Sequence, residues 1–181
     1  YKEVRKNKDN AVAYIGGDIA HSKTDMSPEL IDQLSRLFKN LADICPTIII
    51  AGNHDCNLNN LNRMDCLTPI VENLNHSNLH YLKRTGVYTC ADTDFIVWDV
   101  WDKEKDYIKA KDVPGDRTKV VLFHGTVDKC ETDLGFNLPS DVKITKFKGY
   151  GLGLLGDIHK RQHLNKDETI SYCGSLVQQN H

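Results

Sequence analysis

Short hydrophobic runs recur along the chain and predict buried strands. The runs lie at residues 11–15, 46–50, 94–100, 119–123, 151–155 and 169–173. Several are continuous rather than alternating, which is typical of strands covered on both faces. All are much shorter than the roughly 20 apolar residues that a membrane-spanning helix needs, so the pattern predicts no contact with a membrane.

Residues 28–41 carry a different pattern, in which apolar side chains recur at helical spacing. Ser27 suits the N-cap of this helix and Pro28 suits its first position. A second helix is predicted over residues 66–75. Because the first helix lies between two strands, the sequence predicts an α/β fold, a layered β-sandwich flanked by helices, in a single domain spanning residues 1–181.

The composition is that of an ordinary globular protein, with 40% hydrophobic and 27% charged residues. The formal net charge of −2 excludes a broadly basic surface and leaves only local clusters for contact with nucleic acid. Six cysteines without a C-x-x-C pair, and no apolar leader, predict reduced thiols and an intracellular protein of the cytoplasm or nucleus. The charged stretch 5–10 is interpreted as a solvated loop. We expect the chain to be truncated at both ends.

Four of the predicted strands end alike, in an apolar run followed by side chains that can bind metal, each beside a glycine. The endings are YIGGDIAH (residues 14–21), IIIAGNHD (48–55), VVLFHG (120–125) and LLGDIH (154–159). Singly, Asp18 or Asn53 could be an ordinary turn residue and His124 a structural histidine of the core. Because sites in α/β sheets form beyond the carboxyl ends of the strands, the repetition favours one shared site.

The side chains at these strand ends are carboxylates, a carboxamide and imidazoles, with no thiolate. Such a mixed oxygen and nitrogen set suits Mn²⁺, Mg²⁺ or Fe²⁺, with Zn²⁺ as an alternative. One carboxylate can bridge two ions about 3.5–4 Å apart, an arrangement used for phosphoester cleavage.

Taken together, GGDIAH, GNHD, HG and GDIH resemble the motifs of the calcineurin-like metallophosphoesterase superfamily. Within it, the chain is most similar to SbcD-type DNA repair exonucleases, the meiotic-recombination-eleven family, of phage or large-DNA-virus type. The spacing from Asp18 to Asn53, the SPEL segment and the closing SYCGSLVQQNH segment add to the resemblance, which covers essentially the whole chain. For the viral type, the resemblance implies a viral protein that acts inside a host cell.

The resemblance implies a centre of two divalent metal ions, Mn²⁺ above the alternatives. Asp18 would bridge both ions, Asn53 and His124 would hold the second, and His159 the first. The family usually has histidine where Asp157 stands, so this carboxylate would replace an imidazole on the second ion and favour Mn²⁺ or Mg²⁺.

The resemblance also implies three residues that act without binding metal. His54 would lie over the scissile phosphate as a catalytic residue, Asp55 would orient His54, and His21 would help to place a nucleic-acid end. The family's opening Asp-x-His has no counterpart before Asp18. The fold is therefore expected to lack its first strand, and the chain to hold one ion firmly and the other poorly.

The implied function is a metal-dependent phosphodiesterase, a DNA exonuclease or endonuclease of repair or recombination. Its partners would be DNA and an SMC-like ABC-type ATPase, with a homodimer as a further option. Basic residues in or beside the motif loops could contact DNA, although solvated loop charge explains them equally well: Lys23, Arg63, Lys160, Arg161 and His163. The alternatives are a phosphatase, a small-molecule phosphodiesterase, or a non-catalytic fragment.

Overall fold

A computed structural model of the chain describes residues 1–176. The chain divides into two compact units, residues 1–82 and residues 83–181, hereafter the amino-terminal and the carboxy-terminal unit. Each unit has its own β-sheet. That the two units act as one domain stays a prediction.

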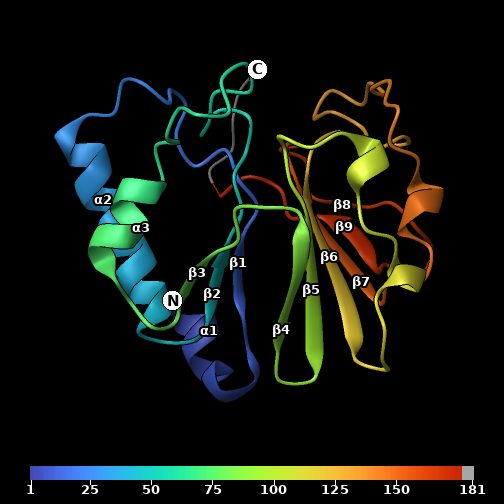
Figure 1. Cartoon of the computed structure of the whole chain (residues 1–181), viewed down its shortest axis with the longest axis horizontal. Helices are drawn as coiled ribbons and strands as arrows, with labels where there is room; N and C mark the ends of the chain where they lie inside the picture. The colour runs from blue at the N-terminus through green and yellow to red at the C-terminus, as the bar shows by residue number, and fades with distance from the viewer. Residues whose placement is uncertain (177–181) are drawn as a thin grey trace. The chain divides into compact units, whose positions relative to one another are not determined.

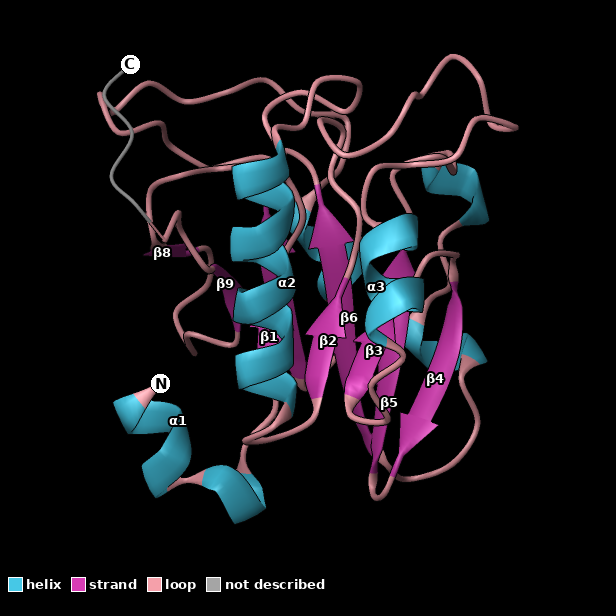
Figure 2. Ribbon diagram, turned by 90° about the vertical axis from the view of Figure 1, so that its left-hand side faces the viewer, coloured by secondary structure: helices cyan, strands magenta, loops and turns pink. Residues whose placement is uncertain are grey.

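The amino-terminal unit is a three-stranded parallel sheet covered by two helices. Its strands are β1 (Ala13–Ile15), β2 (Thr47–Ile49) and β3 (Leu79–Tyr81), in that order across the sheet. Helix α2 (Pro28–Ala42) joins β1 to β2, and α3 (Thr68–Leu74) joins β2 to β3. Both helices lie on the same side of the sheet (Figures 1 and 2). The predicted strand–helix–strand unit and both predicted helices are confirmed.

Helix α2 forms where its capping and its apolar face predict it. The Ser27 hydroxyl accepts a hydrogen bond from the Leu30 amide at 3.2 Å, so it caps a backbone donor that the first turn leaves without a partner. Leu34 and Phe38 are buried against Ile49 in the core of this unit. The buried face of the helix therefore fixes the position of β2, whose end carries the GNHD motif.

The first residues of the chain are helical, which corrects the prediction of a loop over residues 5–10. Helix α1 covers Lys2–Lys6, and a 3₁₀ turn covers Lys8–Asn10. An ion pair between Lys6 and Glu3 at 3.0 Å supports the single turn of α1. Neither segment buries a residue, so both are solvated as expected, but the hydrophobic pattern gave no helical signal.

The carboxy-terminal unit contains a six-stranded sheet. In spatial order its strands are β4 (Gly86–Cys90), β5 (Thr93–Trp98), β6 (Thr118–His124), β7 (Leu152–Gly156), β9 (Ile170–Tyr172) and β8 (Gln162–His163). The four inner strands run parallel, and the edge strands β4 and β8 run antiparallel to their neighbours. The four inner strands match the predicted runs from residue 94 onward, whereas both edge strands were missed.

One face of this sheet is covered by long connections that contain short 3₁₀ turns (Figure 1). The turns are η2 (Glu104–Asp106), η3 (Ala110–Asp112) and η4 (Ile144–Phe147). The largest buried side chain on this face is Trp98, which packs against Phe123 and Phe147. Within residues 1–176, no helix combines the length and the apolar character required to cross a bilayer.

Candidate metal centre

In the amino-terminal unit, the loops after β1 and β2 bring Asp18 to the GNHD motif. The Asp18 carboxylate accepts a hydrogen bond from the His54 amide at 2.9 Å, although the two residues are 36 positions apart. Asp18 has φ +52°, and Asn53 to Asp55 form a turn that begins four residues after the end of β2. The predicted bridging carboxylate and the predicted catalytic histidine therefore belong to one constellation.

Asp55 holds this constellation together. Its side chain is fully buried, and its Oδ1 accepts hydrogen bonds from the Ile19 and Ala20 amides at 2.9 and 3.0 Å. Its Oδ2 accepts a third from the Gly52 amide at 2.9 Å. These bonds offset the desolvation of a buried carboxylate and tie the loop after β1 to the loop after β2. The predicted role of Asp55 as orienting partner of His54 stays a prediction.

His54 is oriented by the backbone of His21. The Nδ1 atom of His54 lies 3.1 Å from the His21 carbonyl oxygen, which can only accept, so Nδ1 carries the hydrogen. In the neutral ring this leaves Nε2 as the acceptor. The two imidazoles stack with centroids 5.5 Å apart, and both side chains belong to exposed residues. His54 is thus held in one tautomer and accessible from solvent, as a proton-transfer group requires.

In the carboxy-terminal unit, neighbouring parallel strands place His124 beside Asp157. His124 ends β6 and pairs in register with Gly156, the last residue of β7, so Asp157 follows directly after that strand. The His124 Nε2 atom lies 3.8 Å from Asp157 Oδ1, beyond ordinary hydrogen-bond length. The His124 side chain is 1% exposed and that of Asp157 27%. A nitrogen and an oxygen donor so placed fit two ligands of one divalent ion.

Thr126 fixes the other oxygen of Asp157. Its hydroxyl donates a hydrogen bond to Asp157 Oδ2 at 3.0 Å. Partners of this kind orient the carboxylates that bind metals. Sequence reasoning missed Thr126, although it stands two residues after His124 in the HGT segment.

Backbone strain coincides with two of the predicted ligands. Asp18 has φ +52° and Asp157 has φ +94°, in a region that residues with a side chain rarely adopt. Such conformations persist only where the surrounding structure enforces them, and they cluster at functional sites. Both predicted ligands therefore have a strained backbone close to a strand end, Asp18 three residues after β1 and Asp157 directly after β7.

The Gly-Ser segment near the end of the chain packs on the backbone of His159. The Ser175 amide donates to the His159 carbonyl at 3.0 Å. Gly174 has φ +77°, and a Cβ atom there would lie 3.1 Å from the same oxygen. Glycine is therefore needed for this close approach, which supports the loop that carries His159. Residues 177–181 of the predicted segment lie outside the described residues.

Tyr172 is a second residue that sequence reasoning missed. Its hydroxyl donates to the Gly125 carbonyl and accepts from the Val127 amide, both at 2.8 Å. Burial raises the pKa of this hydroxyl well above its usual value. Tyr172 lies on β9 and therefore anchors the loop that follows His124. The sequence pattern predicts the strand but not this contact between two distant segments.

Asp99 is a further buried carboxylate at a strand end, directly after β5. Its residue is 4% exposed, and burial raises the pKa of its carboxyl to about 6. Among the described residues its Oδ2 accepts no hydrogen bond, and the Arg84 guanidinium lies 3.6 Å away. A partial sequence signal for Asp99 was present, because the apolar run 95–98 ends in this aspartate. The run lacks the glycine that stands beside the polar residues of the other four strand endings.

The five residues predicted as possible DNA contacts differ in their partners and in their exposure. Lys160 forms an ion pair with Glu131 at 2.7 Å, which offsets its charge. His163 Nδ1 lies 2.7 Å from the Ser171 hydroxyl. Lys23, Arg63 and Arg161 are exposed. Contact of this group with DNA stays a prediction.

The chain is similar to known proteins over almost its whole length. The sequence model of the family described as calcineurin-like phosphoesterase matches residues 1–167. A protein of Acanthamoeba polyphaga mimivirus, named only as uncharacterized, is 41% identical over 183 residues. That alignment covers 95% of this chain but 13% of the viral protein, so the chain spans a small part of the relative's length.

The family match spans nearly the whole chain, and it includes both units and all four strand-end motifs. The mixed α/β architecture, with two sheets and flanking helices, agrees with the fold of this family. Metal-dependent phosphoester hydrolysis, typically with two metal ions, is the chemistry that the family implies. The chain belongs to the calcineurin-like phosphoesterase family.

Proposed function

We propose that the chain carries the hydrolytic site of a DNA exonuclease or endonuclease that acts in repair or recombination. The observation that carries the metal-dependent chemistry is the pair of His124 and Asp157, whose donor atoms lie 3.8 Å apart at neighbouring strand ends. The buried imidazole of this pair has little access to substrate, so it suits metal binding. The similarity to a viral protein supports the viral type of nuclease.

The residues that would hold the ions are those of the sequence prediction, namely Asp18, Asn53, His124, Asp157 and His159. Bound divalent ions would lower the pKa of a water and offset the charge of the phosphate. Asp157 is a hard oxygen ligand, fixed through Thr126, and it favours Mn²⁺ or Mg²⁺ over softer ions. We propose Mn²⁺ as the working metal.

His54 would act on the phosphate and its leaving oxygen. Its Nδ1 atom is engaged by the His21 carbonyl, so Nε2 is the ring atom that can donate or accept the transferred proton. The stacked ring of His21 limits the freedom of this imidazole on one side. His21 itself, exposed beside His54, would contact the nucleic-acid end.

DNA and an SMC-like ABC-type ATPase are the partners that we propose, with a homodimer as a further proposal. A small-molecule phosphodiesterase is the second candidate. The ion pair of Lys160 with Glu131 favours it, because this pair removes one of the basic groups available for a DNA backbone.

The test is a Mn²⁺-dependent nuclease assay on end-labelled DNA. His54→Ala is the variant, and His80→Ala is the matched control, because His80 is an exposed histidine on β3 away from the motif loops. We expect cleavage by the wild type and the control and a large loss in His54→Ala. Cleavage of nucleotides alone would support the second candidate, and equal rates in all three proteins would remove the mechanism.

A further inference from the structure

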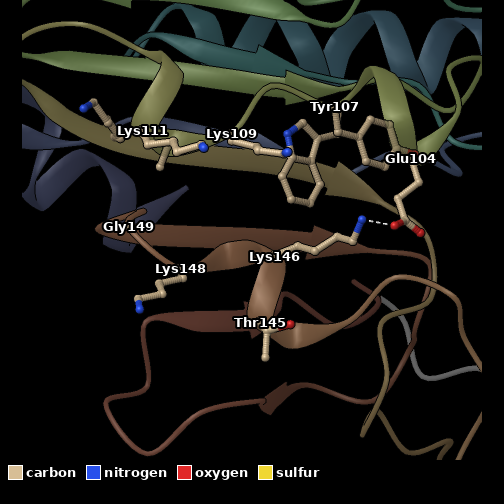
Figure 3. Close-up of a pocket in the computed structure, with 11 residues that line it drawn as sticks. Glu104, Tyr107, Lys109, Lys111, Thr145, Lys146, Lys148 and Gly149 are labelled. Carbon is tan, nitrogen blue, oxygen red and sulfur yellow. Dashed lines mark ion pairs between the residues drawn. The ribbon is translucent and has the colours of Figure 1, made fainter.

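A lysine-rich groove lies in the carboxy-terminal unit, apart from the His124–Asp157 pair. Its volume is about 740 Å³. Its walls contain five lysines, which are Lys109, Lys111, Lys119, Lys146 and Lys148. Figure 3 shows Lys109 and Lys111 along one side and Lys146 and Lys148 along the other. The groove therefore presents ammonium groups from two facing walls.

Most of this charge has no counterion among the residues that the structure describes. Lys146 is paired with Glu104, whereas the other four lysines form no ion pair with any residue between 1 and 176. This concentration of positive charge occurs in a chain whose formal net charge is −2. Like charges around a concave, partly apolar wall repel one another and raise the local potential, so the groove attracts anions.

The lining of the groove also contains two aromatic residues, Trp98 and Tyr107. The Tyr107 ring stacks on Trp98 with centroids 4.9 Å apart and an interplanar angle of 3°. Trp98 is buried, so the half-exposed ring of Tyr107 is the aromatic surface nearer to solvent. Ammonium groups and an aromatic ring in one groove are the combination that binds phosphates and flat bases together.

The groove runs along the strands of the sheet. Lys119 pairs in register with Asp94, and Trp98 pairs with Phe123, so the two ends of the groove lie four residues apart along β5. That corresponds to about 13 Å at the rise of a parallel strand. On β6 itself, Lys119 stands five residues before His124, about 17 Å away along an extended strand. The odd spacing places the two side chains on opposite faces of the sheet, so a strand bound in the groove must pass the end of β6 to reach His124.

We infer that this groove binds single-stranded nucleic acid and holds it while another part of the same strand reaches the metal centre. The identification of the polyanion rests on the proposed nuclease function. A single nucleotide is much shorter than about 17 Å, so a mononucleotide held at Lys119 cannot also reach His124. The groove therefore selects for substrate length.

The test measures binding separately from cleavage. A fluorescent single strand of about 20 nucleotides is titrated with the protein in EDTA, which prevents metal-dependent cleavage, at several salt concentrations. The variant Lys111→Gln/Lys148→Gln removes one lysine from each wall. The control Lys8→Gln/Lys166→Gln removes the same charge at two exposed positions outside the groove.

We expect the groove variant to bind the strand about tenfold more weakly than the wild type and the control. The slope of log K against log salt should fall by about 1.4, since each lost phosphate contact on a single strand contributes about 0.7. Equal affinity of the groove variant and the control for the long strand would overturn the inference.

Two further results separate the inference from the proposed function. Groove-dependent binding by a protein that cleaves no DNA would leave the groove assignment intact and remove the nuclease proposal. Cleavage of DNA that does not depend on the groove lysines or on strand length would leave the nuclease proposal intact and remove the groove assignment. An acidic peptide of matched charge that binds as tightly as the strand would also overturn the assignment to nucleic acid.

Discussion

The exposure of the motif histidines His21, His54 and His124 differs between the two units. In the amino-terminal unit, His21 and His54 are exposed, stacked on each other and linked through a backbone carbonyl. In the carboxy-terminal unit, the His124 side chain is 1% exposed and faces a carboxylate from the next strand. An exposed imidazole can exchange protons with a substrate, whereas a buried one beside a carboxylate suits metal binding. The contrast is the one expected if His54 transfers a proton and His124 binds metal, as proposed above.

Two buried carboxylates, one from each unit, differ in how their oxygens are hydrogen-bonded. Asp55 accepts three backbone hydrogen bonds. Asp99 has one oxygen that accepts no hydrogen bond among the described residues. A buried acid that is fully hydrogen-bonded stabilises the fold around it, and one with an unsatisfied oxygen destabilises it when ionised. Asp55 therefore stabilises the two loops that it joins, whereas ionised Asp99 lowers the stability of the fold.

The largest expected effect is that of His124→Ala. Loss of a buried ligand should lower Mn²⁺-dependent hydrolysis by about a thousandfold or more and abolish tight Mn²⁺ binding. Isothermal titration with Mn²⁺ and an assay of a phosphodiester substrate measure the two effects. His80→Ala controls for the loss of an imidazole at an exposed position. Unchanged Mn²⁺ affinity in His124→Ala would contradict its assignment as a ligand.

Asp55→Asn should give the largest loss of stability. An amide offers one acceptor oxygen where three N–H groups converge, and it brings two donors toward them. We expect the free energy of unfolding to fall by about 3 kcal/mol. Urea denaturation followed by circular dichroism measures it, with the exposed Asp32→Asn as control. A loss below about 1 kcal/mol would show that the three bonds contribute little.

His54→Ala should separate catalysis from metal binding. We expect kcat to fall about a hundredfold, the lower end for loss of a general acid or base, with unchanged affinity for Mn²⁺. The reason is the exposure of His54 and the anchoring of its Nδ1 to a carbonyl rather than toward a metal. Titration and rate measurements on the same preparation test both statements. Parallel loss of Mn²⁺ affinity would place His54 among the ligands.

Asp99→Asn should stabilise the protein at pH 8 and have little effect at pH 4. The pKa of the folded carboxyl is about 6 and its ordinary value is 3.8, so between these values the folded state binds the extra proton. Stability therefore falls as the pH rises from about 4 to 6, and the full penalty remains above that range. We expect a gain of about 2 kcal/mol at pH 8, after loss of the Arg84 attraction.

Urea denaturation of wild type and Asp99→Asn at pH 4 and pH 8 measures this difference. The wild type should lose stability between the two values relative to the variant. Equal unfolding free energies of the two proteins at both pH values would show that the Asp99 carboxylate is accommodated without penalty.

The sequence predicted most of the fold because its inner strands are continuous apolar runs. It missed β3 (Leu79–Tyr81), which buries only Leu79, and the edge strands β4 (Gly86–Cys90) and β8 (Gln162–His163), which bury no residue. It also missed helix α1, which buries nothing. Periodicity reports burial, so short, exposed or edge elements leave no signal in it.

For the candidate site, residue types and strand ends were enough to select candidates, but not to find what holds them. Asp55 binds amides 35 and 36 residues away, and Thr126 binds a carboxylate 31 residues away. Such partners depend on how loops meet in three dimensions. The tautomer of His54 likewise follows from a carbonyl 33 residues away.

Thr126→Val should give the smallest effect and the most specific one. It removes the hydroxyl that binds Asp157 Oδ2, so the carboxylate loses its fixed orientation, and Mn²⁺ affinity should fall about tenfold. Thr89→Val is the matched control, because the Thr89 hydroxyl donates to Asp94 Oδ1 at 2.6 Å in the same unit. Both variants should lose about 1 kcal/mol of stability, so stability alone cannot distinguish them. Only Thr126→Val should weaken Mn²⁺ binding, and an equal loss of affinity in both would show that the effect comes from general destabilisation.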